Sequence, residues 1–291
     1  MGEPEHRFEE DALRILRLYR FAARFGFALD PATGEAAKAL SRHLDCVSAE
    51  RIAEELSRLL AAPKPGTYLE PAVLAVLFPE LNLEMLPEIC RIIDALTPGM
   101  EHFPVRLAAL LCPLGEAGAR AALKRLKVSN ALAENVTVLV RECPKFFRGP
   151  SGGWDPVAEG NRAGNGMARF VSEEEAPDTP HDAVQIQTKR LLGRYDLHTV
   201  EQMDALCGAI CPEKVADFAA QAALARKLEA ESVCCRVNQL AVNGRDLMAA
   251  GVAPGPGLRR VLEGLLEQVI TGRLPNEKAA LLAAAAQFSA S

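Results

Sequence analysis

The chain has 291 residues, of which 49% are hydrophobic, 5% aromatic and 24% charged, and its formal net charge is −5 at pH 7. This mild acidity argues against a protein that grips nucleic acid over its whole surface. The sequence shows no charged-then-apolar leader and no apolar run approaching 18 residues, so neither secretion nor membrane insertion is supported. Eight cysteines without CxxC spacing or a disulfide-like framework predict a reduced, cytoplasmic protein.

The abundance of Ala and Leu, with few alternating β-branched runs, favours helices over strands. We therefore expect an all-α fold, an elongated array of many helices long enough for more than one core. The five histidines are scattered without metal-ligand spacing and pair with no nucleophile. The sequence predicts no metal site and no catalytic residue in this chain.

The segment 10–27, EDALRILRLYRFAARFGF, predicts one helix that Gly26 ends as a left-handed cap. At 100° per residue the arginines of this helix fall within about a third of its circumference, and Asp11 lies one turn ahead of the first of them. These arginines are Arg14, Arg17, Arg20 and Arg24. We assign the rest of the circumference to the buried side, with Ile15, Leu16, Leu18, Tyr19, Ala22, Ala23 and Phe25.

An acid and an arginine three residues apart can read the edge of a nucleobase. The Asp11 carboxylate would accept from the exocyclic amine of cytosine or adenine, while the Arg14 guanidinium donates to the ring nitrogen or carbonyl beside it. Guanine and uracil present a carbonyl in place of that amine, a mismatch worth roughly 1–3 kcal/mol. Arg17 and Arg20 would then hold ribose or triphosphate oxygens. A solvated basic stripe with an ordinary ion pair is the alternative from spacing alone.

Further along, Asp30 and Pro31 predict the start of a helix that runs to about Leu44, and Ser48 predicts the start of the next. Glu50 lies in the first turn of that helix, where the helix dipole favours an acid. Proline-punctuated helices are expected from residue 67 to about 143, with a short basic patch at Lys124, Arg125 and Lys127.

Residues 143–180 are rich in Gly, Pro and acids and predict a long loop or a disordered insertion. Helices are expected again from about residue 181 to 232. In the tail, residues 254–257 precede a helix that carries Arg259 and Arg260, which favours either a phosphate site or an ordinary turn between helices.

Three segments in order resemble one known family. EDALRILRLYRFAARFGF is similar to the neck motif of class II tRNA nucleotidyltransferases, the CCA-adding enzymes, and of the related bacterial poly(A) polymerases. SAERIAEELSRLL (48–60) is similar to the next family motif, and residues 243–282 resemble the family's tail. Residues 106–116, RLAALLCPLGE, resemble a helix that in many relatives carries the His-Asp pair of a phosphohydrolase, but Cys112 and Pro113 stand at those positions.

The resemblance implies roles for these segments. Asp11 and Arg14 would form the protein template for the base of incoming ATP or CTP, Arg17 and Arg20 would belong to the same pocket, and Glu50 and Arg51 would support it. Arg259 and Arg260 in the tail would contact tRNA. The patch of Lys124, Arg125 and Lys127 is a second candidate RNA contact, with a solvated basic face as the alternative. The expected parts are a neck (1–62), body helices with a degenerate HD-like module (63–145), an insertion (146–180), further body helices (181–235) and a tRNA-binding tail (236–291).

Family members also have a catalytic head that holds two magnesium ions, and no Asp-x-Asp pair of that kind occurs here. We expect the isolated chain to transfer no nucleotide and Mg²⁺ to enter only through a separate head domain or chain. The leading hypothesis is the RNA-binding and nucleotide-selecting portion of a CCA-adding enzyme, with tRNA, ATP and CTP as partners. The same portion of a poly(A) polymerase is one alternative, and a non-catalytic RNA-binding or scaffold protein is another.

Overall fold

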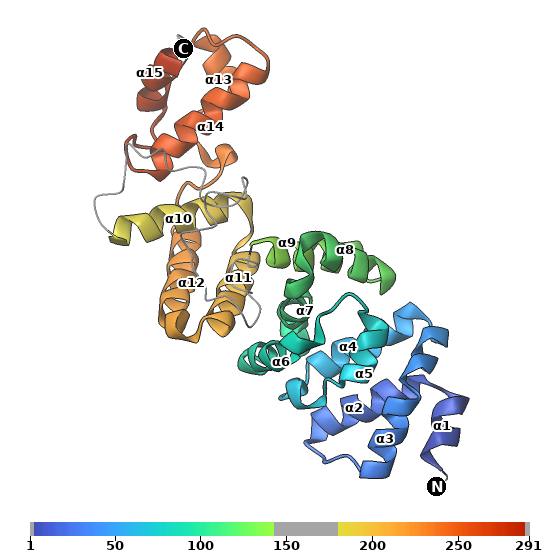
Figure 1. Cartoon of the computed structure of the whole chain (residues 1–291). Coiled ribbons are helices and arrows are strands. Elements are labelled where there is room, and N and C mark those ends of the chain that lie inside the picture. Colours follow the sequence, from blue (N-terminus) through green and yellow to red (C-terminus); the bar gives the residue numbers. More distant parts are fainter. Residues whose placement is uncertain (1–2, 143–179, 289–291) are drawn as a thin grey trace. The chain divides into compact units, whose positions relative to one another are not determined.

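The computed structural model describes residues 3–142 and 180–288, and in this part of the chain every regular element is a helix. The prediction of an all-α fold is confirmed (Figure 1). The expected insertion at 146–180 lies outside the described residues, apart from Pro180 at the start of a helix. None of the described helices combines the length and the apolar composition needed to cross a bilayer.

The chain forms two compact units, each described by itself. The first comprises Met1–Gly166 together with Ala205–Ala216, as far as these residues are described. Its α-helices are α1 (Pro4–Glu10), α2 (Leu13–Phe25), α3 (Pro31–Ala39), α4 (Ala49–Leu60), α5 (Pro71–Leu77), α6 (Leu86–Ala95), α7 (Phe103–Leu111), α8 (Gly115–Arg125) and α9 (Asn130–Glu142). Short 3₁₀ turns connect them, among them η1 (Ser41–Cys46) and η2 (Pro65–Tyr68).

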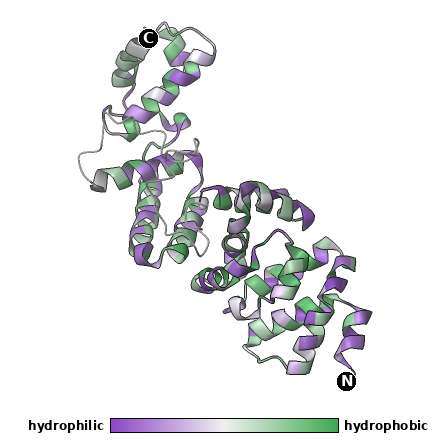
Figure 2. Cartoon of the chain, in the orientation of Figure 1, coloured by the Kyte–Doolittle hydropathy of each residue, from purple (hydrophilic) through white to green (hydrophobic). Residues whose placement is uncertain are grey.

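The second unit comprises Met167–Asp204 and Asp217–Ser291, again as far as described. Its helices are α10 (Pro180–Arg194), the first half of α11 (Leu197–Ile210), α12 (Val215–Ala230), α13 (Gly244–Ala249), α14 (Pro256–Ile270) and α15 (Lys278–Phe288). Hydrophilic and hydrophobic residues alternate along most of these ribbons, as expected for helices that bury one face (Figure 2). The second half of α11 belongs to the first unit.

Two predicted helix boundaries depend on local chemistry that the sequence shows directly. Gly26 ends α2 with φ 68°, the left-handed conformation that glycine adopts at low cost. Asp30 begins α3 because its carboxylate accepts hydrogen bonds from the Thr33 N–H at 3.0 Å and from its hydroxyl at 2.9 Å. The predicted extension of this helix to Leu44 is wrong, since α3 ends at Ala39 and a 3₁₀ segment follows.

The core beside the candidate site lies between α2 and α4. Helix α2 buries Ile15, Leu16 and Tyr19, and α4 buries Leu56 and Leu60, each less than 3% exposed. Burying side chains of this size stabilises the pair by about 1.5–3 kcal/mol each. Because both helices are fixed by this packing, polar side chains on their outer edges have defined positions.

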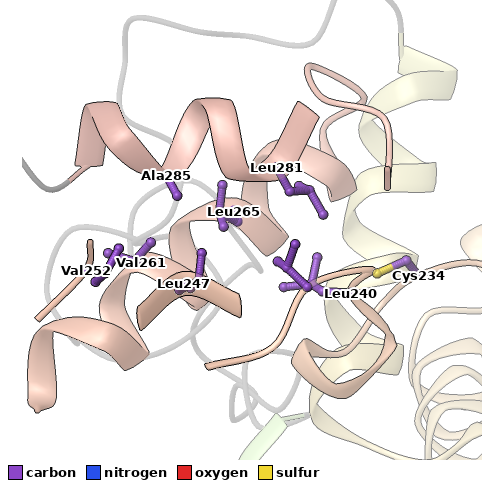
Figure 3. Packing of buried hydrophobic residues seen from close by; sticks show 9 residues of the cluster. Cys234, Leu240, Leu247, Val252, Val261, Leu265, Leu281 and Ala285 are labelled. Carbon is purple, nitrogen blue, oxygen red and sulfur yellow. The ribbon is translucent and has the colours of Figure 1, made fainter. Parts of the chain in front are cut away.

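A separate core holds the C-terminal helices together. Leu247 on α13, Leu265 on α14, and Leu281 and Ala285 on α15 meet there, all 0% exposed (Figure 3). Asn243 begins α13 through a reciprocal capping box, since its side chain accepts from the Asp246 N–H while the Asp246 carboxylate accepts from the Asn243 N–H. The tail helices therefore have their own hydrophobic core.

Candidate functional site

The site begins at a break between α1 and α2. Asp11 has φ −151° and ψ 98°, an extended conformation, and its Oδ1 accepts from the Leu13 N–H at 3.2 Å. The prediction of one continuous helix from Glu10 is therefore wrong at its start, because Asp11 leaves the helical conformation and its carboxylate bonds the first N–H of α2. The Asp11 carbonyl still accepts from the Arg14 N–H at 3.0 Å, so the two residues remain one turn apart.

Helix α4 brings a second arginine to Asp11. Arg51 Nη2 lies 3.4 Å from Asp11 Oδ1 and 3.3 Å from Oδ2, and Arg17 Nη1 lies 3.9 Å from Oδ2. The Asp11 side chain is 26% exposed, so it is neither buried nor sealed from solvent. An ionised carboxylate has about four lone-pair sites, and these contacts leave acceptor capacity for a ligand.

Arg14 is held from its N-terminal side. Its Nη1 donates to Glu10 Oε2 at 2.6 Å and to the Arg7 carbonyl at 2.9 Å. The bonds from Arg14 and Arg7 lower the pKa of the Glu10 carboxyl. The Nε and Nη2 groups of Arg14 are not used by these bonds, and the side chain is 39% exposed. Glu10 is thus a neighbour that orients Arg14, a role that the sequence analysis missed.

Glu55 on α4 is the second residue that the sequence analysis missed. Its side chain is 6% exposed and it accepts from Arg17 Nε at 3.0 Å, while Arg20 Nε lies 2.6 Å from its other oxygen. The Arg20 contact lacks hydrogen-bond geometry and is an ion pair. Glu55 lies one turn after Arg51 on the same face of α4, and that i, i+4 spacing is the signal that would have identified it.

The arginines of α2 therefore differ in accessibility. The side chains of Arg14 and Arg17 are 39% and 42% exposed, whereas that of Arg20 is 10% exposed and is packed between Glu55 and the ring of Phe21. The structure thus brings Asp11, Arg14 and Arg17 to one accessible surface, with Arg20 behind it.

The assignment of Phe25 to the buried side of α2 is wrong, because this side chain is 54% exposed. Eleven residues separate Phe25 from Arg14, and at 100° per residue the two side chains point within about 20° of each other. Phe21 and Phe27 are also exposed, at 43% and 62%. An aromatic surface thus continues along the accessible face of α2.

Glu50 is not part of this network in the described residues. The Glu50 carboxylate accepts a hydrogen bond from Lys127 Nζ at 3.1 Å. Bonds from the backbone N–H of Glu50 and from Lys127 lower the pKa of this carboxyl. Of the two residues predicted to support the pocket, Arg51 contacts Asp11, and Glu55 rather than Glu50 pairs with an arginine of α2. Arg125 donates to both Glu80 oxygens, at 2.7 and 2.8 Å, and Lys124 is exposed. Of this predicted basic patch, Arg125 and Lys127 are neutralised locally by acids.

The basic residues of the tail are more open. Arg259 is 85% exposed and pairs with Glu263 within α14, and Arg260 is exposed without a carboxylate partner among the described residues. Both lie in the first turns of α14, which begins at Pro256. They remain the predicted RNA contacts of the tail.

The HD-like segment is a packing element in this structure. Arg106 is fully buried and donates to the carbonyls of Leu60, Ala62 and Leu96 at 2.5–2.6 Å. Burial raises the pKa of the Cys112 thiol above its usual range. In the part of the chain that the structure describes, no three His, Cys, Asp or Glu side chains come together as a metal site requires.

Two family models match the chain. One is described as tRNA nucleotidyltransferase domain 2 and covers residues 183–285, and the other is "Probable RNA and SrmB-binding site of polymerase A" and covers residues 26–85. The first begins within α10 and includes the tail, and the second begins at Gly26 directly after α2.

Known proteins of similar sequence are CCA-adding enzymes. Those of Limosilactobacillus fermentum and Levilactobacillus brevis are each 29% identical to this chain, over 99% and 98% of its length. The chain spans 62% of the length of either relative.

Solved structures give the same fold. The Thermotoga maritima CCA-adding enzyme complexed with tRNA-CCA matches with a TM-score of 0.57 at 17% identity, covering 96% of this chain and 62% of that one. A complex of a CCA-adding enzyme with ATP matches with a TM-score of 0.58 at 18% identity, covering 96% and 61%. Through its two matching domain models, its relatives and its fold, the chain is similar to tRNA nucleotidyltransferases and poly(A) polymerases.

Proposed function

We propose that this chain is the nucleotide-selecting and RNA-binding portion of a CCA-adding tRNA nucleotidyltransferase, with CTP, ATP and tRNA as its ligands. The observation that carries the proposal is the accessible Asp11 carboxylate, fixed by Arg51 and by the Leu13 N–H, with Arg14 one turn further on. The similarity to CCA-adding enzymes along almost the whole chain supports the same conclusion.

The chemistry of base selection follows from the donors and acceptors present. Arg51 and Arg17 lie 3.3 and 3.9 Å from Asp11 Oδ2, and a carboxylate of this kind only accepts hydrogen bonds. The amines of cytosine and adenine donate to such a group, whereas the carbonyls of uracil and guanine are repelled by it. The Nε and Nη2 groups of Arg14, which the bonds of Nη1 leave unused, would donate to the adjacent ring positions. The expected discrimination is about 1–3 kcal/mol, or roughly 5- to 150-fold in affinity.

Arg17 is placed to hold a ribose or phosphate oxygen of the same nucleotide. Its Nε is fixed by Glu55, and its terminal groups lie at the accessible surface beside Asp11. Arg20 acts from behind, as a brace that keeps Glu55 in position. In the tail, Arg259 and Arg260 would contact RNA phosphates, which position an RNA without reading its sequence.

The transfer step itself requires groups that the described residues do not supply. Nucleotidyl transfer uses carboxylates that hold two metal ions, and no such cluster occurs in the described part of this chain. Magnesium would therefore be held by a separate catalytic head. We expect the isolated chain to select and bind but to transfer no nucleotide.

The test uses this chain fused behind the part of the Limosilactobacillus fermentum enzyme that it does not cover. Calorimetric titration should show binding of ATP and CTP, with GTP and UTP at least fivefold weaker, and Asp11→Ala or Arg14→Ala should abolish this preference. Arg58→Ala removes an exposed arginine that pairs with Glu54 on α4, and it should leave the preference intact. Equal binding of all four nucleotides would refute the proposal.

A second candidate function is the same portion of a poly(A) polymerase. The match of residues 26–85 to a model of polymerase A favours it. The same fusion protein separates the two candidates when it is given tRNA that lacks its 3′ end. Incorporation of C before A supports a CCA-adding enzyme, and A-only tailing supports a poly(A) polymerase.

A further inference from the structure

Two phenylalanines of the C-terminal half of α2 and a third just past its Gly26 cap are exposed and stack on one another. Phe21 and Phe25 have ring centroids 6.2 Å apart with an interplanar angle of 6°, and Phe25 and Phe27 have centroids 5.4 Å apart at 26°. All three are among the exposed large hydrophobic side chains of the chain. We refer to Phe21, Phe25 and Phe27 as the aromatic platform.

The platform is held in place by its surroundings. The Arg20 guanidinium lies 4.0 Å from the centroid of Phe21, and Arg20 is itself held by Glu55. Gly26 reverses the chain with φ 68°, and the Phe27 N–H then bonds the Ala22 carbonyl at 3.1 Å. This reversal returns Phe27 toward Phe25, so the stack is a consequence of the helix cap.

Charge around the platform favours a polyanion. The Arg24 guanidinium lies 5.4 Å from the Phe25 centroid, and Arg24 makes no ion pair with a carboxylate of the described residues. Arg17 lies further along the same helix, toward Asp11. Arginines interleaved with exposed aromatic rings are typical of surfaces that bind single-stranded nucleic acid, where bases stack on the rings and cations contact the phosphates.

The platform also lies at a suitable distance from the proposed base-reading pair. With a rise of 1.5 Å per residue, Phe21 is about 10 Å and Phe25 about 16 Å along the helix from Arg14. Stacked bases are about 3.4 Å apart, so about three to five base steps of an RNA end span this distance. The last nucleotides of an RNA on the platform would thus lie next to an incoming nucleotide.

We propose that the aromatic platform binds the single-stranded 3′-terminal nucleotides of the RNA that is to be extended. The inference rests on the proposed function, because it places the RNA end beside the nucleotide site. The bases stack on the exposed parts of the rings without hydrogen-bond reading, and Arg24 contacts the phosphates. The platform therefore tolerates different bases, while Asp11 and Arg14 choose the incoming nucleotide.

The test measures binding of a labelled RNA hairpin to this chain by fluorescence anisotropy, with and without a single-stranded ACC 3′ extension. The wild-type chain should bind the extended hairpin about fivefold or more tightly than the blunt one. Phe21→Leu and Phe25→Leu, which keep an apolar side chain and remove the flat ring, should each lose most of that preference. Met100→Leu changes a residue as exposed as Phe25 in the same unit and should retain it.

Several outcomes would overturn the inference. Equal affinity of the wild-type chain for both hairpins would do so. An undiminished preference in both leucine variants would also do so, because an apolar surface that docks a protein segment or a second copy tolerates leucine. Far-ultraviolet circular dichroism confirms that the variants are folded. Nucleotide selection by the fusion protein is measured separately, so its failure would refute the proposed function while the hairpin preference still tests the platform.

Discussion

Replacing Glu55 by alanine tests whether the α2–α4 contact is stabilised by a buried ion pair. The Glu55 side chain is 6% exposed and the Arg20 side chain 10%, so the substitution leaves a largely buried guanidinium without its partner. Breaking such a pair costs about 3–5 kcal/mol of unfolding free energy. Arg17 is 42% exposed, and loss of its bond adds at most about 1 kcal/mol because solvent screens it.

The neighbouring Glu54 provides a matched control. It pairs with Arg58 at 2.6 Å, but their side chains are 60% and 49% exposed, so Glu54→Ala should cost only about 0.3–0.5 kcal/mol. Both substitutions convert Glu to Ala in α4, so the change in helix propensity cancels. Urea denaturation followed by circular dichroism gives the stabilities, and hydrogen exchange of α2 amides localises the effect. A Glu55→Ala cost within about 1 kcal/mol of the control would refute the reasoning.

Three further predictions concern other parts of the chain. Burial raises the pKa of Asp204 to about 7 from 3.8, so the folded state binds this proton more tightly than the unfolded state and stability should fall as pH rises from about 4 to about 7. In Asp204→Asn this dependence of stability on pH should disappear. Between pH 4 and pH 7 the unfolding free energy of the wild-type chain should therefore fall by up to about 4 kcal/mol more than that of the variant, as measured by urea titration. Parallel pH profiles of the two proteins would contradict the prediction. Arg106→Met leaves three buried carbonyls unpaired and should lower the thermal midpoint by at least about 10 °C, whereas a shift under about 3 °C would refute this. A Cβ added at Gly34 in α3 meets no atom within 4 Å, so Gly34→Ala should stabilise the chain by about 0.5–1 kcal/mol. A Cβ at Gly66 would lie 2.9 Å from a backbone carbonyl, so Gly66→Ala should destabilise it. Urea titrations in which both variants change the stability in the same direction would contradict this prediction.

The Cys90 carbonyl explains why these two glycines differ. A Cβ at Gly66 would meet this carbonyl and the Asp94 carboxylate, which accepts from the Gly66 N–H at 2.9 Å. The distinction depends on the packing of η2 against α6, which joins residues about 28 positions apart. Spacing along the sequence does not contain this information.

Local chemistry made a large part of the fold predictable. The left-handed cap at Gly26, the start of α3 at Asp30 and the helical class of the described chain follow from short-range hydrogen bonds, propensity and steric preference. The shared face of Arg14 and Arg17 on α2 was predictable in the same way, because side chains three and four residues apart share a face of any helix.

What the sequence by itself determined is therefore the helical class and the grouping of Arg14 and Arg17 on one face of α2, one turn after Asp11. Only the tertiary structure decided which groups these side chains contact. Three ion pairs join residues 35 to 77 positions apart in the sequence: Arg51 with Asp11, Glu55 with Arg20, and Glu50 with Lys127. Such contacts depend on how helices pack, and a long charged side chain can reach several partners until packing fixes one of them.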